Sequence, residues 1–278
     1  MTLAISVLGL GIMGRPMARN LLQAGCEVRG WNRSELPPDL IEGIPLCQTV
    51  EEASRAAVCL MMMLDSTAVD AVLEQMEPHL ATGQVVLDMS SSDPIRSIIH
   101  AQRLAAKGVG WIDAPVSGGP EGAAAGTLAI MAGGTASDFE SVKPVLNILG
   151  GNVVHVGGPG MGHVAKIINQ VIVGLTIEAV AEGLTLAEKS GVDPQLIQRA
   201  LKGGFADSKI LQIHGTRMIK RTYEPGAKAT IQLKDLRLAR ALAETAKIRL
   251  PHVESLIGFY EKLIAKRDGE LDLSLIHI

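Results

Sequence analysis

Aromatic residues are scarce in this chain of 278 amino acids, since Phe, Trp and Tyr together make up only 3% of it. Hydrophobic residues nevertheless make up 47%, which is ample for a substantial core. We therefore expect a core of aliphatic side chains with many of the 11 methionines. A chain of this length forms two domains more readily than one.

The sequence also lacks a basic field, a disulfide framework and a metal-binding motif. Its formal net charge is -3, which argues against nucleic acid as a main partner. Cys26, Cys47 and Cys59 form no CxxC pair and have no histidine at metal-ligand spacing. They are typical of small buried residues in a reducing compartment. We expect a cytoplasmic protein without a bound metal.

No stretch is typical of a secretory signal or a membrane span. The chain enters an apolar strand at once, with no basic segment before a cleavable apolar one. The longest apolar region begins at Val164 and is interrupted by Lys166, Asn169, Gln170 and Glu178. Such polar residues are costly inside a bilayer, so we expect no membrane partner.

A glycine-rich loop is the first motif that indicates a function. An apolar segment, 3–8, runs into Gly9-Leu10-Gly11-Ile12-Met13-Gly14, and a helical segment follows. Between a strand and a helix this GxGxxG spacing predicts dinucleotide binding. Gly9 would make the tight turn, Gly11 would let the backbone approach a pyrophosphate, and Gly14 would let the helix pack closely. The helix N-terminus would offer free amides to the phosphates; the alternative is a turn that binds nothing.

The end of the second predicted strand, 27–31, indicates which dinucleotide is bound. NAD-binding proteins commonly place a carboxylate there to hold the 2′-hydroxyl, but this chain has Asn32, Arg33 and Ser34. An arginine can hold a 2′-phosphate through two hydrogen bonds, and no carboxylate repels that phosphate. The pattern favours NADP(H). NAD(H) stays possible, because Arg33 could be an ordinary surface residue.

Two further loops follow predicted inner strands and so lie where open parallel sheets bind ligands. Met63 and Leu64 end the apolar run 58–64, and we expect them beside the nicotinamide or the ribose. Ser91 follows the strand predicted over 85–89, and we expect it to contact the cofactor. The serines of that loop could equally cap the next helix.

A third loop, Ser117-Gly118-Gly119, also follows a predicted strand. Its hydroxyl and backbone amides would form a small concave site, which suits an anionic group such as a carboxylate. A plain turn is the alternative. This loop is therefore the candidate site for the acidic head group of a substrate.

The long apolar helix predicted over 164–190 divides the chain, because strands alternate with helices before it and only helices follow it. It carries Lys166 in its first predicted turn, after a glycine-rich turn and before Asn169 and Gln170 on the same face. Burial and the positive helix end would both disfavour the lysine's cation. An ammonium beside two amides suits polarising a carbonyl and delivering a proton to its oxygen. Lys166 is thus the catalytic candidate, the alternative being a lysine that extends off a helix end.

Two features lie further along the chain. Lys234 and Asp235, on a helix predicted around 231–246, would by themselves be interpreted as an exposed charged pair. The tail 271–278 is apolar, and we expect it to dock on a neighbouring subunit.

These motifs together resemble those of the β-hydroxyacid dehydrogenases, a family that includes 3-hydroxyisobutyrate dehydrogenase, tartronate semialdehyde reductase and the glyoxylate/succinic semialdehyde reductases. The resemblance covers essentially the whole chain. It is carried by segments 9–14, 88–91, 113–119, 162–170 and 234–235. The segments 166–173, 181–191 and 203–205 are most similar to the tartronate semialdehyde reductase branch.

The resemblance implies an α/β fold with two domains. A Rossmann-like, doubly wound NADP-binding domain would cover 1–162, and an all-helical domain beginning with the long interdomain helix would cover 163–278 and form a homodimer or homotetramer. It also implies site residues. The catalytic lysine falls on Lys166, and the cofactor-closing segment near the nicotinamide falls on Lys234 and Asp235. The substrate-binding positions fall on Ser117, Gly118, Gly119, Asn169 and Gln170, the last being Asn in many members.

The activity so implied is NADP(H)-dependent interconversion of a short β-hydroxy acid and its semialdehyde, with Lys166 as general acid and base. The favoured substrate is 2-hydroxy-3-oxopropionate (tartronate semialdehyde). The alternatives are an NAD-dependent 3-hydroxyisobutyrate dehydrogenase and a glyoxylate/succinic semialdehyde reductase. A non-catalytic NADP(H) sensor or scaffold is the alternative from another class. Such a protein would not need Lys166, which related imine reductases and chromatin-associated proteins lack.

Overall fold

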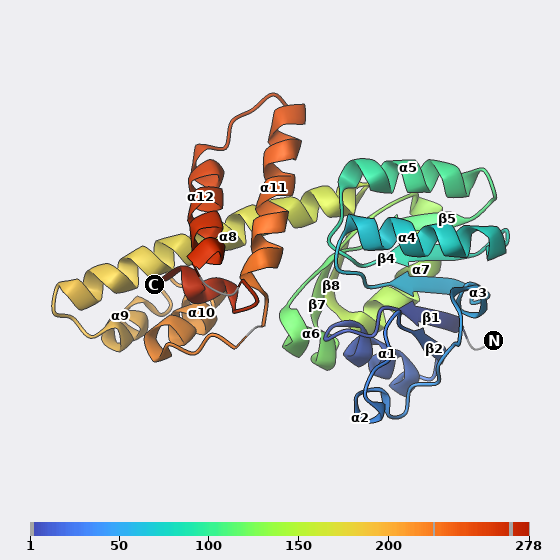
Figure 1. The fold of residues 1–278 in the computed structure, drawn as a ribbon, viewed down its shortest axis with the longest axis horizontal. Coiled ribbons are helices and arrows are strands. Elements are labelled where there is room, and N and C mark those ends of the chain that lie inside the picture. Colours follow the sequence, from blue (N-terminus) through green and yellow to red (C-terminus); the bar gives the residue numbers. More distant parts are fainter. Residues whose placement is uncertain (1–2, 225, 267–268, 278) are drawn as a thin grey trace. The chain divides into compact units, whose positions relative to one another are not determined.

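The chain folds into two compact units, Met1–Lys166 and Ile167–Ile278. The computed structural model describes residues 3–224, 226–266 and 269–277. The first unit combines strands with helices, drawn in blue to green in Figure 1, and the second is helical, drawn in yellow to red.

In the described part of the first unit, eight strands form one sheet with the order β2-β1-β3-β4-β5-β7-β6, and β8 pairs with β7. The strands are β1 (Ala4–Leu8), β2 (Glu27–Trp31), β3 (Val58–Met61), β4 (Val85–Asp88), β5 (Gly110–Asp113), β6 (Val116–Ser117), β7 (Leu128–Gly133) and β8 (Gly150–Gly157). The first five are mutually parallel, and β7 is antiparallel to β5 and β6. The chain leaves β1 toward β2 and returns to β3 on its other side. The predicted doubly wound sheet is therefore confirmed, with a switch point at β1.

Helices cover both faces of this sheet (Figure 1). They are α1 (Gly14–Gln23), α2 (Pro38–Ile41), α3 (Val50–Ala53), α4 (Ser66–Met76), the 3-10 turn η1 (Glu77–His79), α5 (Pro94–Ala105), α6 (Gly119–Ala125) and α7 (Ala136–Leu149). On β3, Val58 and Leu60 belong to the cluster that includes α1 and α7, while Cys59 and Met61 pack with α3, α4 and α5. Successive strand residues thus meet opposite layers. Burial on both sides explains why β3 and β4 are continuous apolar runs.

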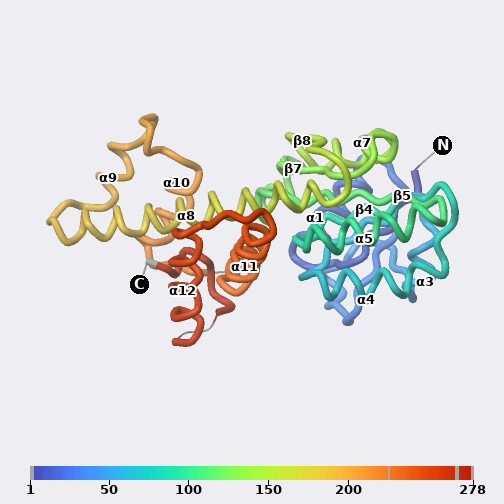
Figure 2. Tube along the Cα trace, turned by 90° about the horizontal axis from the view of Figure 1, so that it is seen from above, coloured from blue at the N-terminus to red at the C-terminus, as the bar shows by residue number. Residues whose placement is uncertain are grey.

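The second unit is built from helices, which Figure 2 traces from the yellow α8 to the red α12. They are α8 (Met161–Lys189), which starts in the first unit, α9 (Pro194–Leu201), α10 (Lys209–Lys220), α11 (Ala229–Thr245), α12 (Pro251–Lys266) and the 3-10 turn η2 (Leu273–His277). The start of α8 at Met161 precedes the predicted start at Val164. α9 begins as a cap-and-proline start requires, since the Asp193 carboxylate accepts from the amide of Gln195 at 2.8 Å.

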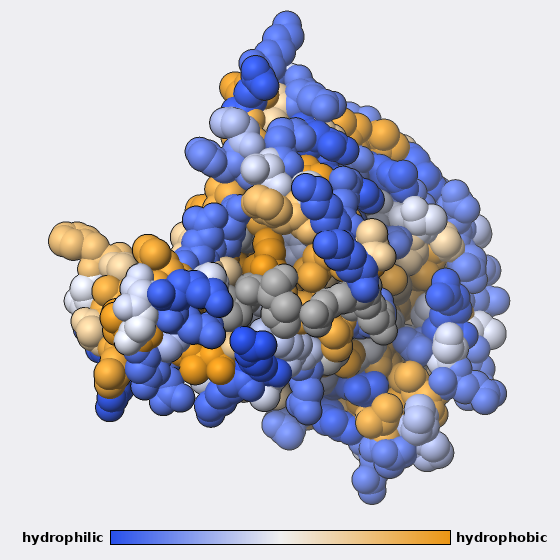
Figure 3. Space-filling view, turned by 60° about the vertical axis from the view of Figure 1, so that its left-hand side comes forward, coloured by the Kyte–Doolittle hydropathy of each residue, from blue (hydrophilic) through white to orange (hydrophobic). Residues whose placement is uncertain are grey.

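By length and composition α8 could cross a membrane. This is weak evidence, because a helix that packs in a protein core meets the same two criteria. Ile177 and Leu184 of α8 are buried in the core of the second unit together with Leu236 and Leu256. On the face drawn in Figure 3, hydrophobic residues (orange) are scattered among hydrophilic ones (blue).

The apolar C-terminal tail packs within its own chain, which corrects the expectation that it docks on a neighbouring subunit. Leu273 and Leu275 are 4% and 1% exposed. The Tyr260 hydroxyl donates to the carbonyl of Leu273 at 3.0 Å. Ile278 lies outside the described residues. The tail completes the core of the second unit.

Asp272 fixes this tail in place. Its fully buried carboxylate accepts from Arg217 Nη1 at 2.6 Å and from the backbone amide of Ser274 at 3.1 Å, and it lies 3.4 Å from His214 Nδ1. Burial alone would raise the pKa of Asp272. The nearby His214 imidazole, the hydrogen bonds from Ser274 and the charge of Arg217 outweigh burial, so the pKa of Asp272 lies far below the usual range.

Replacing Asp272 by Asn should lower the free energy of unfolding at pH 7 by about 1.5–3 kcal/mol, the range for hydrogen bonds to charged groups. Because the folded-state pKa is depressed, this stabilisation is present above the unfolded pKa of about 3.9 and is lost as pH falls below it. Urea unfolding of wild type and D272N at pH 7 and pH 3.5 measures the difference. The difference in free energy of unfolding between wild type and D272N should be smaller at pH 3.5 than at pH 7. A difference independent of pH would contradict this account.

Candidate functional site

The glycine loop joins β1 to α1 at the carboxyl edge of the sheet. A Cβ at Gly9, whose φ is +99°, would lie 2.3 Å from the Met62 carbonyl oxygen. A Cβ at Gly14 would lie 1.9 Å from the Gly9 carbonyl oxygen, whereas one at Gly11 would meet nothing within 4 Å. The fold itself thus requires glycine at the first and last positions. The middle glycine leaves space that the protein does not fill, which suits a dinucleotide's pyrophosphate.

The N-terminus of α1 is open electrostatically as well. It has no side-chain cap and no acidic residue in its first turn. Leu10 is fully buried under the loop, while Ile12 is 56% exposed and Met13 is half-buried. The uncapped amides carry a partial positive charge that favours a phosphate. The loop can therefore bind a cofactor through its backbone while Leu10 anchors it below.

The loop after β2, which the sequence predicts to select the dinucleotide, is hydrogen-bonded to the glycine loop. Asn32 Oδ1 accepts from the amide of Leu10 at 3.0 Å, and Asn32 Nδ2 donates to the carbonyl of Ser34 at 2.8 Å. Arg33 and Ser34 are exposed. The Asn32 side chain therefore has a structural task, and it holds the loop with the exposed Arg33 next to the glycine loop.

The loops after β3 and β4 reach the same edge of the sheet. The amide of Met62 donates to the carbonyl of Leu8 at 2.8 Å, and the amide of Met63 donates to Ser90 Oγ at 2.8 Å. Leu64 is 67% exposed and Ser91 is half-buried. The structure brings these predicted cofactor residues together with the glycine loop. The sequence analysis missed Ser90, whose hydroxyl joins the two loops.

The candidate carboxylate-binding loop lies where β6 meets α6. Ser117 ends β6 and is half-buried, and Gly118 and Gly119 follow with φ values of +141° and +65°. Residues other than glycine rarely adopt such positive φ values. That the hydroxyl and backbone amides of this loop bind an anionic group stays a prediction.

Three buried polar side chains hold the first turn of α8 against the sheet. Asp88 and Asp113 end β4 and β5 and are partners in register. Asp113 accepts from the amides of Gly160 and His163 at 2.7 and 3.0 Å, and His163 Nε2 lies 3.2 Å from Asp88 Oδ2. The three side chains are 0% exposed. A Cβ at Gly162 would lie 2.2 Å from the Asp113 carbonyl oxygen, so the helix approaches the strand as closely as the backbone allows.

Burial affects the two carboxylates differently. Burial alone would raise the pKa of Asp88, but hydrogen bonds from His163 and Ser90 and the charge of His163 hold it below its usual value. Burial raises the pKa of Asp113, outweighing the charge of His163 and the two backbone hydrogen bonds. Asp88 is thus the anionic partner of the buried histidine. The sequence analysis assigned no role to these three residues, although an Asp at the end of two successive buried strands was a signal.

Lys166 lies in the second turn of α8, one turn after His163, and is half-buried. The sequence analysis placed it in the first turn, where the positive helix end would disfavour a cation. The structure corrects this position, because α8 starts at Met161. The positive helix end is also occupied, since the Asp113 carboxylate accepts from the amides of Gly160 and His163. Partial burial is the part of that argument that remains.

In the second unit, an amide chain joins α8 to α11. Asn169 Nδ2 donates to Gln170 Oε1 at 2.9 Å, and Gln170 Nε2 donates to Asp235 Oδ2 at 2.9 Å and to Gln232 Oε1 at 3.0 Å. Asp235 is 2% exposed, and its other oxygen lies 3.2 Å from Lys234 Nζ. The longer side chain of Gln170 thus reaches α11. Gln232 is a further residue that the sequence analysis missed.

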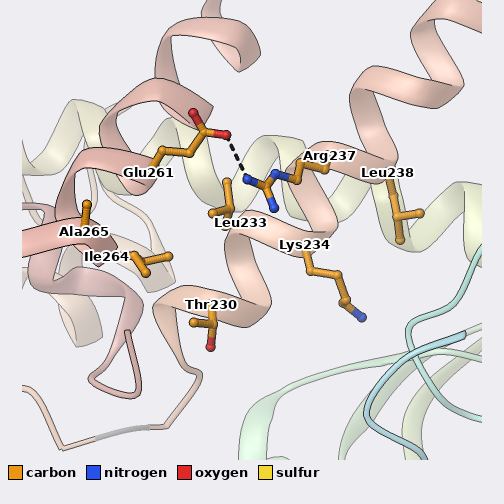
Figure 4. A pocket seen from close by; sticks show the side chains of 8 residues that line it. All are labelled: Thr230, Leu233, Lys234, Arg237, Leu238, Glu261, Ile264 and Ala265. Carbon is orange, nitrogen blue, oxygen red and sulfur yellow. Dashed lines mark hydrogen bonds and ion pairs between the residues drawn. The ribbon is translucent and has the colours of Figure 1, made fainter. Parts of the chain in front are cut away.

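A groove of about 740 Å³ lies between α11 and α12. Lys234 borders it together with Arg237, which pairs with Glu261 at 2.9 Å. Figure 4 shows the Lys234 side chain directed away from that ion pair. The other lining residues are Thr230, Leu233, Leu238, Ile264 and Ala265. Of the predicted site residues, Lys234 belongs to this groove.

No metal site is found among the residues that the structure describes, where no group of three or more His, Cys, Asp or Glu side chains could hold a metal ion. Cys26, Cys47 and Cys59 are free thiols. Burial raises the pKa of Cys59 to about 11, which makes its thiol unreactive at neutral pH.

Comparison with known proteins adds family information to this geometry. The profile of the NAD-binding domain of 6-phosphogluconate dehydrogenase matches residues 4–157. The profile of the NAD-binding domain of NADP-dependent 3-hydroxyisobutyrate dehydrogenase matches residues 160–277. Together the two profiles cover nearly the whole chain.

Similar proteins of known activity are oxidoreductases. The 2-hydroxy-3-oxopropionate reductase of Escherichia coli is 39% identical over 98% of this chain and 95% of its own. The 3-hydroxyisobutyrate dehydrogenase of Pseudomonas aeruginosa is 32% identical over 98% of this chain and 96% of its own. The solved Mycobacterium tuberculosis 3-hydroxyisobutyrate dehydrogenase with L-serine has a TM-score of 0.88 at 28% identity, covering 100% and 98% of the two chains.

The different demands on the loop glycines can be tested with two substitutions. Gly11→Ala should leave the unfolding midpoint unchanged, because its Cβ meets no protein atom, but should weaken NADPH binding about tenfold or more by crowding the phosphates. Gly14→Ala should destabilise the fold by about 1–3 kcal/mol through overpacking. Urea unfolding and fluorescence titration with NADPH measure both effects. Unchanged NADPH affinity in G11A would contradict a pyrophosphate site at this glycine.

Proposed function

The chain belongs to the 3-hydroxyisobutyrate dehydrogenase-like β-hydroxyacid dehydrogenases, and from this premise we propose that it reduces 2-hydroxy-3-oxopropionate with NADPH, using Lys166 as the general acid. The family makes the protein an NAD(P)-dependent oxidoreductase that acts on a hydroxyl group or the corresponding aldehyde. The substrate, the preference for NADP and the role of Lys166 are the proposal.

One observation carries the choice of substrate. The 2-hydroxy-3-oxopropionate reductase of Escherichia coli shares 39% identity over nearly the full length of both chains. The 3-hydroxyisobutyrate dehydrogenase of Pseudomonas aeruginosa shares 32%. This difference favours tartronate semialdehyde over the branched hydroxy acid.

The residues of the first unit fit a bound dinucleotide. The open space at Gly11 and the uncapped N-terminus of α1 suit the pyrophosphate. Arg33 is exposed next to that loop and is proposed to hold a 2′-phosphate through its guanidinium. Met63, Leu64 and Ser91 lie at the same sheet edge and are proposed to line the rest of the cofactor site.

The substrate is proposed to bind by its carboxylate to the Ser117 hydroxyl and the amides of Gly118 and Gly119. Asn169 is proposed to hold Lys166 and a substrate oxygen. The amide of Gln170 bonds to Asn169, Asp235 and Gln232, so Gln170, which the sequence placed at the substrate, is proposed to support Asn169 instead. The bound reduced nicotinamide would supply a hydride to the aldehyde carbon. As the carbonyl electron pair moves to oxygen, the Lys166 ammonium stabilises the developing alkoxide and donates its proton, leaving an alcohol and a neutral amine. In the reverse direction the neutral amine takes the hydroxyl proton.

The proposal extends to the location of the enzyme, its oligomeric state and the roles of Lys234 and Asp235. Three free cysteines are typical of a reducing compartment, so we infer a cytoplasmic location. The family resemblance implies a homodimer or a homotetramer. Lys234 is proposed to contact the cofactor, while the Asp235 carboxylate bonds within the second unit.

Reversing the charge of Arg33 should separate the two cofactors. Arg33→Asp should weaken NADPH binding roughly 10- to 100-fold, the equivalent of lost hydrogen bonds to a charged group, and NADH binding much less. Fluorescence titration with both cofactors measures the ratio. Arg55→Asp is a matched control, because Arg55 is also exposed and pairs with Glu51 on α3. Equal weakening of both cofactors by R33D would refute the 2′-phosphate role.

The proposed activity is tested by initial rates at 340 nm with NADPH and NADH against tartronate, methylmalonate and succinic semialdehydes and glyoxylate. Tartronate semialdehyde with NADPH should give the highest kcat/KM. Lys166→Ala should lower kcat by about 10²- to 10⁴-fold, as expected for lost acid–base catalysis, with little change in NADPH affinity. Lys189→Ala, an exposed lysine at the other end of α8, is the control. A different preferred substrate would replace the specific proposal, and full turnover by K166A would remove Lys166 from the mechanism.

A further inference from the structure

The amide chain between α8 and α11 has a fixed direction, and we propose that Asp235 sets it. This buried carboxylate is a positioning residue that makes Asn169 present its amide oxygen, rather than its amide nitrogen, on the face of α8 that carries Lys166. The consequence for catalysis rests on the proposed role of Lys166.

The direction starts at α11. The Asp235 carboxylate is 2% exposed and lies 3.2 Å from the Lys234 ammonium. A carboxylate paired with a cation can only accept hydrogen bonds. Gln170 must therefore turn its NH2 group toward Asp235, and the observed distance from Nε2 to Oδ2 is 2.9 Å.

Gln232 supports the direction that Asp235 sets. Its side chain is 1% exposed, and its Nε2 donates to the backbone carbonyl of Gln170 at 3.1 Å. Its Oε1 is thereby left facing Gln170 Nε2 at 3.0 Å. A flipped Gln170 amide would set its oxygen against two acceptor oxygens in a buried site, where an unmade hydrogen bond is costly.

Gly174 makes room for this arrangement. It lies one helical turn after Gln170 on α8, and a Cβ there would lie 2.7 Å from Gln232 Nε2. The helix surface is thus shaped around the Gln232 amide, which keeps that amide close to the Gln170 backbone.

The orientation then passes to Asn169. With its nitrogen committed to α11, Gln170 offers only Oε1 to its neighbour, and Asn169 Nδ2 donates to it at 2.9 Å. The Oδ1 atom of Asn169 is left as the other end of that amide. Asn169 is half-buried and lies three residues after Lys166, which puts both on one helix face.

An oxygen at this position has a chemical consequence. An amide oxygen attracts an ammonium or accepts from an alcohol hydroxyl, whereas an amide NH2 repels an ammonium. The chain from Asp235 to Asn169 therefore favours the protonated form of Lys166, which aldehyde reduction requires. A carboxylate that does not touch the reacting atoms would in this way set the polarity of the site.

The test is Asp235→Asn, which keeps the shape but can present either oxygen or nitrogen to Gln170. Its kcat should fall about tenfold, as for a disrupted buried hydrogen bond, with the NADPH KM within about twofold of wild type. The double variant Gln170→Glu with Asp235→Asn restores direction. Its new amide on α11 can donate to the new carboxylate on α8, and that carboxylate can only accept from Asn169. The double variant should regain at least about fivefold in kcat over D235N, with Gln232 left imperfectly paired.

Controls distinguish the possible failures. Asp272→Asn changes another buried carboxylate of the second unit, one that takes no part in the hydrogen-bonded amide series, and should keep kcat per folded molecule. Wild-type kcat in D235N, or no recovery in the double variant, would overturn the directional role while an inactive K166A left the proposed mechanism standing. An active K166A would overturn the mechanism itself. If D235N did not fold, the double variant would carry the test alone. Its carboxylate on α8 still accepts only from Asn169, so kcat within about twofold of wild type is expected, and a tenfold loss would overturn the directional role.

Discussion

The rest of the candidate site depends on how the first turn of α8 is held. Asp113 takes up two amides of that turn, and Asp88 holds the imidazole of His163 in the same turn. Removing one partner of such a buried group leaves an uncompensated charge or an unpaired donor, which is strongly destabilising. The helix therefore starts at one place on the sheet. Lys166 lies one turn later, so its placement follows from two carboxylates at the strand ends.

The same principle operates in the second unit on side chains. Asp235 fixes the nitrogen of Gln170, and Gln170 in turn fixes Asn169. In both units a buried acceptor imposes geometry on α8, first on its backbone and then on its amides. Carboxylates suit this task because they only accept hydrogen bonds and so leave their partners one orientation.

Much of the fold could be predicted because the signals are local. Apolar runs gave the parallel strands, the glycine spacing gave the β1–α1 turn, and Asp193 with Pro194 gave the start of α9. The clamp and the amide chain could not be predicted in this way, since they join residues 75 and 65 positions apart in sequence. The C-terminal tail was misjudged for the same reason. Its apolar residues show that it must be covered, but composition does not say by what.

The glycine loop shows where function can be separated from folding. Gly9 and Gly14 are required by backbone atoms within 2.3 Å of an added Cβ, so the fold alone accounts for them. Gly11 meets no such demand. The space in front of it, at the uncapped end of α1, is where we propose that the pyrophosphate of the cofactor binds.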